Sequence, residues 1–255
     1  MATDMTPSSA ALQEELLRRA RARAGSRPAA PAPSAVREPS PAPLSHAQRR
    51  MWLMDRLGQG GSLYSVPFAT RLRGPLDVDA LAVALTGLVR RHHVLRTRYG
   101  QQGDEAYQEV LAAPDAMEVV VVESDGDGLP VLTEEAGRPF DLSAGPLPRA
   151  LVVRHGPQDH TVMLTFHHIS IDGGSLETVA DELSQLYAEA VDERPHTRPD
   201  PPQYADFARR EHAAAERLGE GLDHWVRRLA GATPVRLPRP AERRPGRRRR
   251  VRASC

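Results

Sequence analysis

The segment from Thr161 to Ala190 constrains the fold most, because it joins a strand, a polar turn and a helix without interruption. Its first part, the run VMLTF at 162–166, is wholly apolar apart from one threonine and has the length of a buried strand. From Ser175 onward, apolar side chains recur at helical spacing, at Leu176, Val179, Ala180, Leu183, Leu186, Tyr187 and Ala190. A buried strand followed by an amphipathic helix predicts a sheet with helices packed on it.

Between these two elements lies the sequence HHISIDGGS, which begins at His167 and His168 and includes Asp172 and Gly173. Chemistry is commonly mounted where a buried strand ends, since the scaffold below is rigid and the loop above is open. Imidazole also has an unperturbed pKa that suits proton transfer near neutral pH. Adjacent strand residues point to opposite faces, so at most one of the two histidines faces a given cavity. The segment predicts one functional imidazole, against the alternative of two backbone-satisfied histidines beside an Asp-Gly turn.

Two other kinds of site are considered for the same histidines. A metal site is not expected, because adjacent strand histidines do not easily chelate one ion and no His-x-x-x-His or Glu-x-x-His helix supports them. A Ser-His-Asp triad fails because the chain has no Gly-x-Ser-x-Gly nucleophile elbow. The single cysteine, Cys255, excludes an internal disulfide framework and a cysteine-based zinc site.

The net charge of +1 hides an uneven distribution. Residues 239–255 hold eight of the 34 basic residues and one of the 33 acids, which leaves 26 bases and 32 acids in residues 1–238. The body is therefore acidic and the basicity is terminal. No apolar stretch reaches the length of a membrane span, and Met1 to Ser9 lack a signal pattern. We expect a cytoplasmic protein.

The order of expected elements is irregular. Helices are predicted from Ser45 to Leu57, after Asp77, from Ser175, and from Tyr204 to Leu229. Strands are predicted at 68–73, 95–99, 106–111, 117–122, 150–154 and 161–167, the last two as a hairpin. Strands and helices that do not alternate regularly favour an α+β domain over a doubly wound one.

Four motifs, in order, resemble those of the condensation domains of nonribosomal peptide synthetases, in the chloramphenicol acetyltransferase-like superfamily. The first is LSHAQRRMW at 44–52, and the second is RHHVLRTRY at 91–99, where His93 stands in place of a glutamate and Tyr99 in place of a phenylalanine. The third is the His-His-x-x-x-Asp-Gly segment, in which Gly174 stands where tryptophan is frequent. The fourth is YADFA at 204–208.

The resemblance implies the first lobe of a two-lobed fold, with a mixed sheet flanked by helices. It implies amide bond formation between aminoacyl or peptidyl thioesters, carried on the phosphopantetheine arms of carrier proteins in other synthetase modules, with no cofactor bound directly. His168 is implied to be catalytic, as a base or as a positioning group, and His167 to be structural. Asp172 is implied to pair with Arg96, so its loss is expected to cost about 3–5 kcal/mol. Gly173 is implied to keep the backbone clear of substrate.

The expected organisation is a helical region at 1–24, a Pro- and Ala-rich linker at 25–43, a truncated lobe at 44–238 and an Arg-rich disordered tail at 239–255. The tail could bind nucleic acid, could have no function, or could be translated in a shifted frame, which is the interpretation favoured here. Motifs of a second lobe are missing, so little activity is expected from this chain alone. The alternatives are a non-catalytic fragment that binds a carrier protein, and acyl transfer to an alcohol.

Overall fold

A computed structural model describes residues 41–58, 60–194, 198–215 and 219–233. The predicted N-terminal helix, most of the predicted linker and the Arg-rich tail lie outside these residues. The chain divides into two compact units, residues 1–209 and 210–255, and the first unit holds both sheets. The boundary between the two units falls within helix α6 (Tyr204–Ala215).

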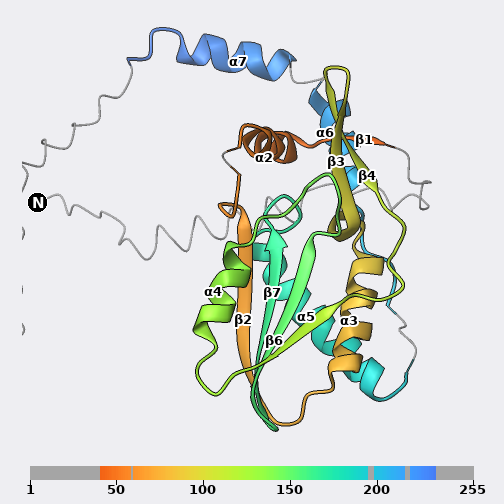
Figure 1. Cartoon of the computed structure of the whole chain (residues 1–255). Coiled ribbons are helices and arrows are strands. Elements are labelled where there is room, and N and C mark those ends of the chain that lie inside the picture. The colour runs from red at the N-terminus through yellow and green to blue at the C-terminus, as the bar shows by residue number, and fades with distance from the viewer. Residues whose placement is uncertain (1–40, 59, 195–197, 216–218, 234–255) are drawn as a thin grey trace, which may run out of the picture. The chain divides into compact units, whose positions relative to one another are not determined.

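The larger sheet has four strands in the order β2-β7-β6-β5 (Figure 1). Its strands are β2 (Ser65–Arg73), β7 (Asp159–His167), β6 (Pro148–Gly156) and β5 (Val119–Glu123). β2 and β6 pair antiparallel with β7, and β5 pairs parallel with β6, so the sheet is mixed. Apolar runs in β6 and β7 are buried on both faces, as the uninterrupted pattern of VMLTF predicts.

Helices cover both faces of this sheet. Helices α3 (Val78–Arg91) and α5 (Gly173–Val191) pack side by side on one face, around a core that includes Phe166, Leu88 and Val152. The other face carries α4 (Leu129–Gly137), which packs Val131 and Leu132 against β6 and β7. The strand that leads to the histidines is thereby clamped between two apolar layers.

A second, smaller sheet has the order β1-β4-β3, formed by β1 (Ala42–Pro43), β4 (Glu105–Val110) and β3 (Thr97–Gln102). Ala42 and Pro43, which the sequence analysis counts with the linker, therefore belong to the folded unit. Helix α2 (His46–Arg56) lies beside this sheet (Figure 1). Its buried residues are Gln48 and Trp52, one turn apart on the same face.

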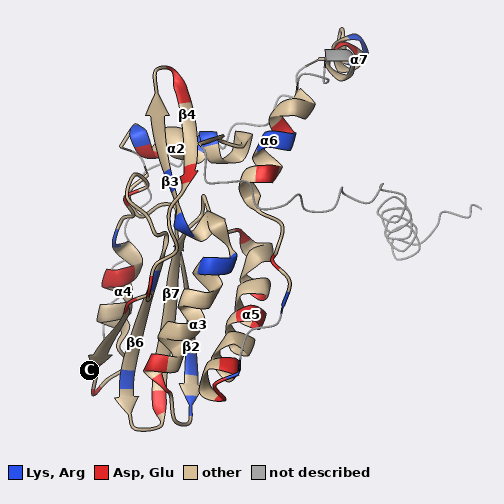
Figure 2. Cartoon of the chain, turned by 90° about the vertical axis from the view of Figure 1, so that its right-hand side faces the viewer, with Lys and Arg blue, Asp and Glu red and all other residues tan. Residues whose placement is uncertain are grey.

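Local signals explain where the helices begin and end. Ser45 and Gln48 form a reciprocal capping box at the start of α2, and the Asp77 side chain accepts from the amide of Ala80 at the start of α3. Helix α3 carries an acid in its first turn and ends on Arg90 and Arg91, which favours its macrodipole. Its basic end is blue in Figure 2.

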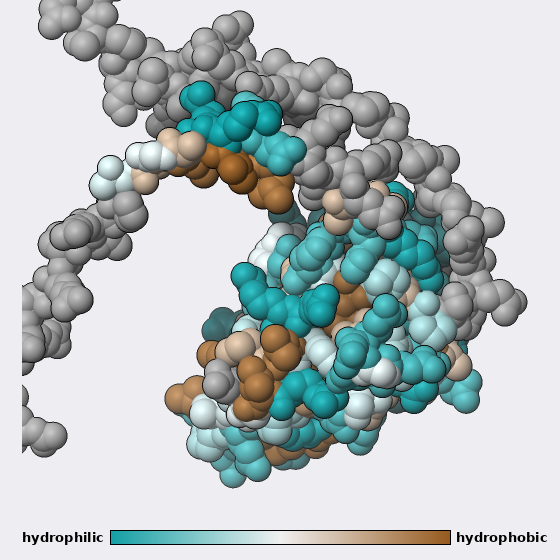
Figure 3. Space-filling view, turned by 90° about the horizontal axis from the view of Figure 1, so that it is seen from above, coloured by the Kyte–Doolittle hydropathy of each residue, from teal (hydrophilic) through white to brown (hydrophobic). Residues whose placement is uncertain are grey.

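The C-terminal part differs from the predicted single helix. It is described as α6 and α7 (Gly219–Leu229), with residues 216–218 between them outside the described residues. Along α7, one stripe is apolar and more than half exposed, while the opposite side is polar (Figure 3). The stripe consists of Leu222, Trp225, Val226 and Leu229.

Two further expectations need correction. Residues 93–96 form a short 3₁₀ helix, η1 (His93–Arg96), before strand β3, where a strand from Leu95 is predicted. The Thr97 hydroxyl donates to the His93 carbonyl at 2.7 Å, which closes this turn. Helix α4 is not predicted at all, because its nine residues include none that is fully buried and its first turn contains a proline.

Candidate active site

The two histidines end strand β7 and leave the sheet together. His167 is the last residue of β7 and pairs with Ser65 of β2, and the amide of His168 donates to the carbonyl of Tyr64 at 2.8 Å. The His167 carbonyl accepts from the amide of Ser170 at 2.9 Å and from its hydroxyl at 2.8 Å. These bonds fold the chain into a tight turn directly after the strand, so the backbone carrying both imidazoles is held on two sides.

His168 lies on the exposed side of this turn. Its Nδ1 atom is 2.7 Å from the carbonyl oxygen of Ile171, and a carbonyl only accepts, so Nδ1 carries a proton and donates it. In the neutral ring the lone pair is then on Nε2. The local fold therefore orients the imidazole through one nitrogen and presents the other as a base or hydrogen-bond acceptor.

His167 is arranged in the opposite way. Its side chain is buried, and its Nδ1 accepts a hydrogen bond from the amide of Ile169 at 3.0 Å, so its proton is on Nε2. The rings of Tyr64 and Phe140 stand 5.9 Å from it, centroid to centroid. Burial, together with the nearby His168, lowers the pKa of His167 to about 4. At neutral pH it is a buried, uncharged imidazole, and its structural role stays a prediction.

Asp172 begins helix α5 and is exposed. Its carboxylate accepts from the Ser175 hydroxyl at 2.6 Å and from the Ser175 amide at 2.9 Å, while the Asp172 amide donates to the same hydroxyl at 3.3 Å. These hydrogen bonds to Ser175 hold the pKa of Asp172 below its usual range. The residue is an N-cap that anchors the end of the turn to the helix.

The predicted ion pair between Asp172 and Arg96 is wrong. Both residues are described, and no ion pair joins them, because the Asp172 carboxylate is bound to the helix start. The Arg96 guanidinium instead donates through Nη1 to the Leu111 carbonyl. Its Nε is buried and has no hydrogen-bond partner within the described part of the chain. Arg96 belongs to the second motif, but its guanidinium does not bind the Asp172 carboxylate.

Gly173 has no structural need to be glycine. A β-carbon built there meets no atom within 4 Å, and its backbone is outside the left-handed region. A side chain at this position would extend into open space next to Asp172 in the chain. The backbone does not explain why this residue is glycine. That Gly173 keeps space free for a substrate stays a prediction.

The first, second and fourth motifs meet in space through buried and partly buried polar contacts. Gln48 of the first motif and Gln108 of β4 exchange side-chain hydrogen bonds at 3.0 and 3.3 Å. Gln48 also donates to the Tyr99 hydroxyl of the second motif at 3.2 Å. Ser45 and Tyr204 of the fourth motif share a hydroxyl–hydroxyl bond of 3.0 Å. Residues up to 159 positions apart in the chain are thus joined in one network.

An apolar cluster connects that network to the histidines. Trp52 and Tyr99 pack in the same buried cluster as Ile169, the residue that directly follows His168. Leu44, Leu142 and Leu147 complete the buried part of this cluster. The first and second motifs therefore form the packing surface on which the turn after β7 rests.

Comparison with known families gives an independent assignment. A family model described as "Condensation domain" matches residues 40–253. The chain belongs to this family. The match supports the resemblance carried by the four motifs, and the solved relatives support the chloramphenicol acetyltransferase-like α+β fold, with a mixed sheet flanked by helices.

The curated relatives are much longer peptide synthetases. The enniatin synthase of Fusarium equiseti is 36% identical over 214 residues, which is 81% of this chain and 7% of the synthase. The phosphinothricin tripeptide synthetase PhsC of Streptomyces viridochromogenes is 37% identical over 258 residues, covering 93% of this chain and 23% of that one. The condensation domain described here is thus similar to a small part of enzymes of nonribosomal peptide synthesis.

Solved relatives also extend beyond this chain. The X-domain from teicoplanin biosynthesis, solved in complex with OxyB, has a TM-score of 0.69 and 28% identity, and the match covers 82% of this chain and 48% of that one. SgcC5 from Streptomyces globisporus has a TM-score of 0.61 and 31% identity, covering 76% and 47%. The chain spans about half the length of these structures.

Sequence reasoning missed one acid of the condensation domain, Glu182 on α5. Its carboxylate binds His92 Nε2 at 2.9 Å and Arg91 Nε at 3.3 Å, with all three side chains largely buried. Burial raises the pKa of Glu182, but the hydrogen bonds from His92 and Arg91 outweigh it and leave the pKa lowered. The signal was present in the sequence: Glu182 interrupts the apolar stripe of α5 between Val179 and Leu186. The second motif is thus tied to α5 through Arg91, not through Arg96.

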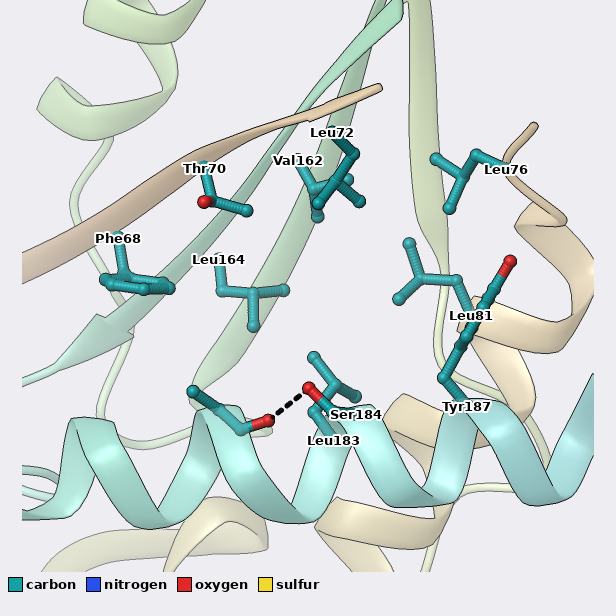
Figure 4. A pocket seen from close by; sticks show the side chains of 11 residues that line it. Phe68, Thr70, Leu72, Leu76, Leu81, Val162, Leu164, Leu183, Ser184 and Tyr187 are labelled. Atoms are coloured by element: carbon teal, nitrogen blue, oxygen red, sulfur yellow. Dashed lines mark hydrogen bonds between the residues drawn. The ribbon is translucent and has the colours of Figure 1, made fainter. Parts of the chain in front are cut away.

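A pocket of about 320 Å³ opens elsewhere on the condensation domain, between strands β2 and β7 and helix α5 (Figure 4). Phe68, Leu164 and Leu183 line it together with Thr70, Ser184 and Tyr187, and none of the predicted site residues does. Across the described residues, no three His, Cys, Asp or Glu side chains gather closely enough to hold a metal. A search of those same residues for a helix able to cross a membrane finds none.

Proposed function

We propose that this condensation domain supplies the histidine-bearing half of an amide-forming site, with His168 as its reactive imidazole. In the proposed reaction, the α-amine of an acceptor aminoacyl thioester attacks the carbonyl carbon of a donor thioester. A C–N bond forms, the C–S bond of the donor breaks, and the thiol of the donor arm leaves. The amine gives up one proton, and the departing thiolate takes one.

The exposed Nε2 of His168 is the single observation that carries this proposal. The bond from Nδ1 to the Ile171 carbonyl fixes the ring plane, so Nε2 has a defined direction before any substrate arrives. A fixed acceptor there can orient the attacking amine and take its proton. The neutral state of His167 removes a competing charge next to it.

The partners proposed are carrier proteins that deliver both thioesters on phosphopantetheine arms, with no cofactor held by the chain itself. The names and lengths of the relatives support this, since each relative is a synthetase far longer than the matched segment. The chain spans about half the length of the solved relatives, so we propose that it needs the remaining half of the fold for full activity. We expect a cytoplasmic location.

The test is amide formation between two loaded carrier proteins, measured by mass spectrometry of the released product. The chain is assayed alone and together with a polypeptide that supplies the second half of the fold. Transfer is expected in the combined sample and is expected to be lost with His168→Ala. His155→Ala is the control, since His155 binds Gly126 and Thr161 in the hairpin, away from the site. Equal transfer by His168→Ala and the unchanged chain would refute the proposal.

A second candidate is a non-catalytic module that binds a partner protein. The X-domain, at 28% identity, is known in a complex with the protein OxyB, which favours considering this class. If this candidate is right, carrier-protein binding is unaffected by His168→Ala and no transfer occurs even when the second half is present. The same experiment therefore separates the two candidates.

The acceptor atom is a separate question. One relative, 37% identical over 212 residues, is named as the beauvericin nonribosomal cyclodepsipeptide synthetase of Gibberella fujikuroi, and depsipeptides contain ester bonds. A hydroxyl acceptor needs more help with proton removal than an amine, so it would depend more strongly on a basic Nε2. Parallel assays with amino and hydroxy acceptors decide between the two bonds.

A further inference from the structure

A single arginine, Arg149, binds the C-terminal end of helix α4. Arg149 lies on β6, with a side chain only 14% exposed, and its Nε forms an ion pair with the Glu135 carboxylate. Its Nη2 donates to the Glu135 carbonyl at 3.2 Å and to the Arg138 carbonyl at 2.9 Å. Its Nη1 donates to the Pro139 carbonyl at 3.3 Å. One guanidinium therefore binds one carboxylate and three backbone carbonyls, those of Glu135, Arg138 and Pro139.

This arrangement uses properties that are special to arginine. Helix α4 ends at Gly137, and its last carbonyls have no partners within the helix, so a cation there is favoured by the macrodipole. The planar guanidinium fork can reach several acceptors at once, whereas a lysine ammonium is a compact point charge on a flexible stem. The path of residues 138–140 depends on this fork.

The segment that Arg149 binds is followed directly by Phe140, whose ring contacts His167. The Arg149 Cζ atom stands 3.8 Å from the centroid of the Phe140 ring, a close cation–π contact. The Phe140 ring also makes a T-shaped contact with His167, at 5.9 Å between centroids and 84° between planes. Phe140 also packs against the cluster that contains Ile169. A continuous chain of contacts thus runs from Arg149 through Phe140 to the residues on both sides of His168.

We propose that Arg149 is a positioning residue, which holds Phe140 against His167 and Ile169 and thereby fixes the turn that aims His168. This inference rests on the proposed function of His168. Arg149 does not touch the open side of the site, and its effect on the reaction passes entirely through Phe140. A purely structural clasp between α4 and β6 would stabilise the fold but leave the two histidines unchanged.

The experiment compares Arg149→Met and Arg149→Lys in the full chain, with Arg154→Met as the control. Arg154 lies on the same strand and pairs with Glu123 at 2.8 Å, but on the surface, far less buried than Arg149. The imidazole resonances of His167 and His168 are followed by NMR as the pH is varied. Urea unfolding is measured on the same samples to separate global stability from local position.

In the unchanged chain His167 titrates near 4 because it is buried. Arg149→Met is expected to release Phe140, admit water to the His167 ring and raise its pKa by about one unit. Arg149→Lys is expected to give a smaller rise, and Arg154→Met none. If Arg149→Met lowers stability while the His167 titration stays unchanged, Arg149 only joins α4 to β6 and the proposal is wrong.

A second variant guards against a chain that fails to fold. Phe140→Leu leaves Arg149 and its carbonyl contacts in place but removes the ring edge from His167, and it is expected to raise the His167 pKa as Arg149→Met does. An unchanged His167 titration in Phe140→Leu contradicts the proposed path.

The carrier-protein assay then separates this inference from the proposed function. In the combined sample with the second half, Arg149→Met is expected to lower the transfer rate at saturating substrate by about ten- to a hundredfold. If His168→Ala has no effect on transfer, the proposed function fails, whereas the NMR result on Arg149 is unaffected. If His168→Ala abolishes transfer and Arg149→Met changes neither the rate nor the titrations, the positioning role fails alone.

Discussion

The two sides of the turn after β7 are built on opposite principles. Below the turn lies the site floor, which we define as His167, Ile169, Trp52, Tyr99 and Phe140. Its side chains are buried or partly buried, and His167 Nδ1 and the Tyr99 hydroxyl accept hydrogen bonds from the Ile169 amide and from Gln48. Above it lies the site rim, which we define as His168, Asp172 and Gly173, all exposed. The floor is packed into a buried cluster, whereas the rim presents the second imidazole nitrogen of His168 and the open space at Gly173. The imidazole proposed to react therefore lies on the exposed side of the turn, and the packing that supports it lies on the buried side.

The largest stability effect is expected in the floor, from Trp52→Ala. Trp52 is 8% exposed and packs in the cluster beneath the turn, so its truncation leaves a cavity and is expected to cost about 3–5 kcal/mol of unfolding free energy. Leu53→Ala on the same helix is the control, because Leu53 is 52% exposed and its loss should cost no more than about 0.5 kcal/mol. Urea unfolding measures both, and equal costs would contradict a buried floor.

The next largest loss of stability is expected from Glu182→Ala, on helix α5 outside the site floor. This change leaves the Arg91 guanidinium largely buried without its carboxylate, at an expected cost of about 3 kcal/mol. Asp159→Ala, which breaks the exposed pair with Arg71, should cost far less than Glu182→Ala, because solvent screens an exposed ion pair. Because the pKa of Glu182 is lowered on folding, the carboxylate stabilises the fold above its ordinary pKa, and this contribution is lost as the pH falls below it.

A smaller and pH-dependent effect separates floor from rim. The unfolded chain takes up a proton on His167 near pH 6.5, but the folded chain does so only near pH 4, so folding is progressively penalised as the pH falls between these values. The expected penalty is on the order of 2 kcal/mol after allowance for solvent screening. His167→Asn keeps an acceptor for the Ile169 amide and should lose this dependence. A stability–pH curve identical to that of the unchanged chain would contradict a neutral, buried His167.

The smallest effect is expected in the rim. Asp172→Ala removes an exposed helix cap and should cost about 1 kcal/mol, not the larger amount expected for a buried ion pair. Asp172→Asn keeps the acceptor and should be close to neutral. Circular dichroism during thermal unfolding measures both variants. A cost above about 3 kcal/mol for Asp172→Ala would restore the ion pair with Arg96.

The sequence predicted those parts of the fold whose signals are local. The caps at Ser45 and Asp77 and the hairpin of β6 and β7 are confirmed, because each depends on residues close together in the chain. Helix α4 is held by Arg149, and η1 is bound by Gln203, whose side chain accepts from the His93 amide at 3.0 Å. These contacts join residues that are 11 and 110 positions apart in the chain, so they produce no periodic pattern in the sequence.

The residues of the candidate site stay a prediction, whereas the one ion pair predicted among them is wrong. The order of the motifs indicated His167, His168, Asp172 and Arg96 as site residues, but it could not predict which carboxylate forms an ion pair with which arginine. The structure joins Arg91 to Glu182 and leaves Asp172 on the helix start. Hydrogen-bond partners depend on distances of tenths of an ångström between distant segments, and a spacing pattern does not contain them.

The most direct test of this division is the protonation state of each imidazole nitrogen, measured by ¹⁵N NMR on the full chain. At pH 8 we expect His168 to carry its proton on Nδ1, bonded to the Ile171 carbonyl, and His167 to carry its proton on Nε2. On acidification His167 should remain neutral until about pH 4. A proton on Nε2 of His168, or titration of His167 near its ordinary value, would contradict the separation of a closed floor from a reactive rim.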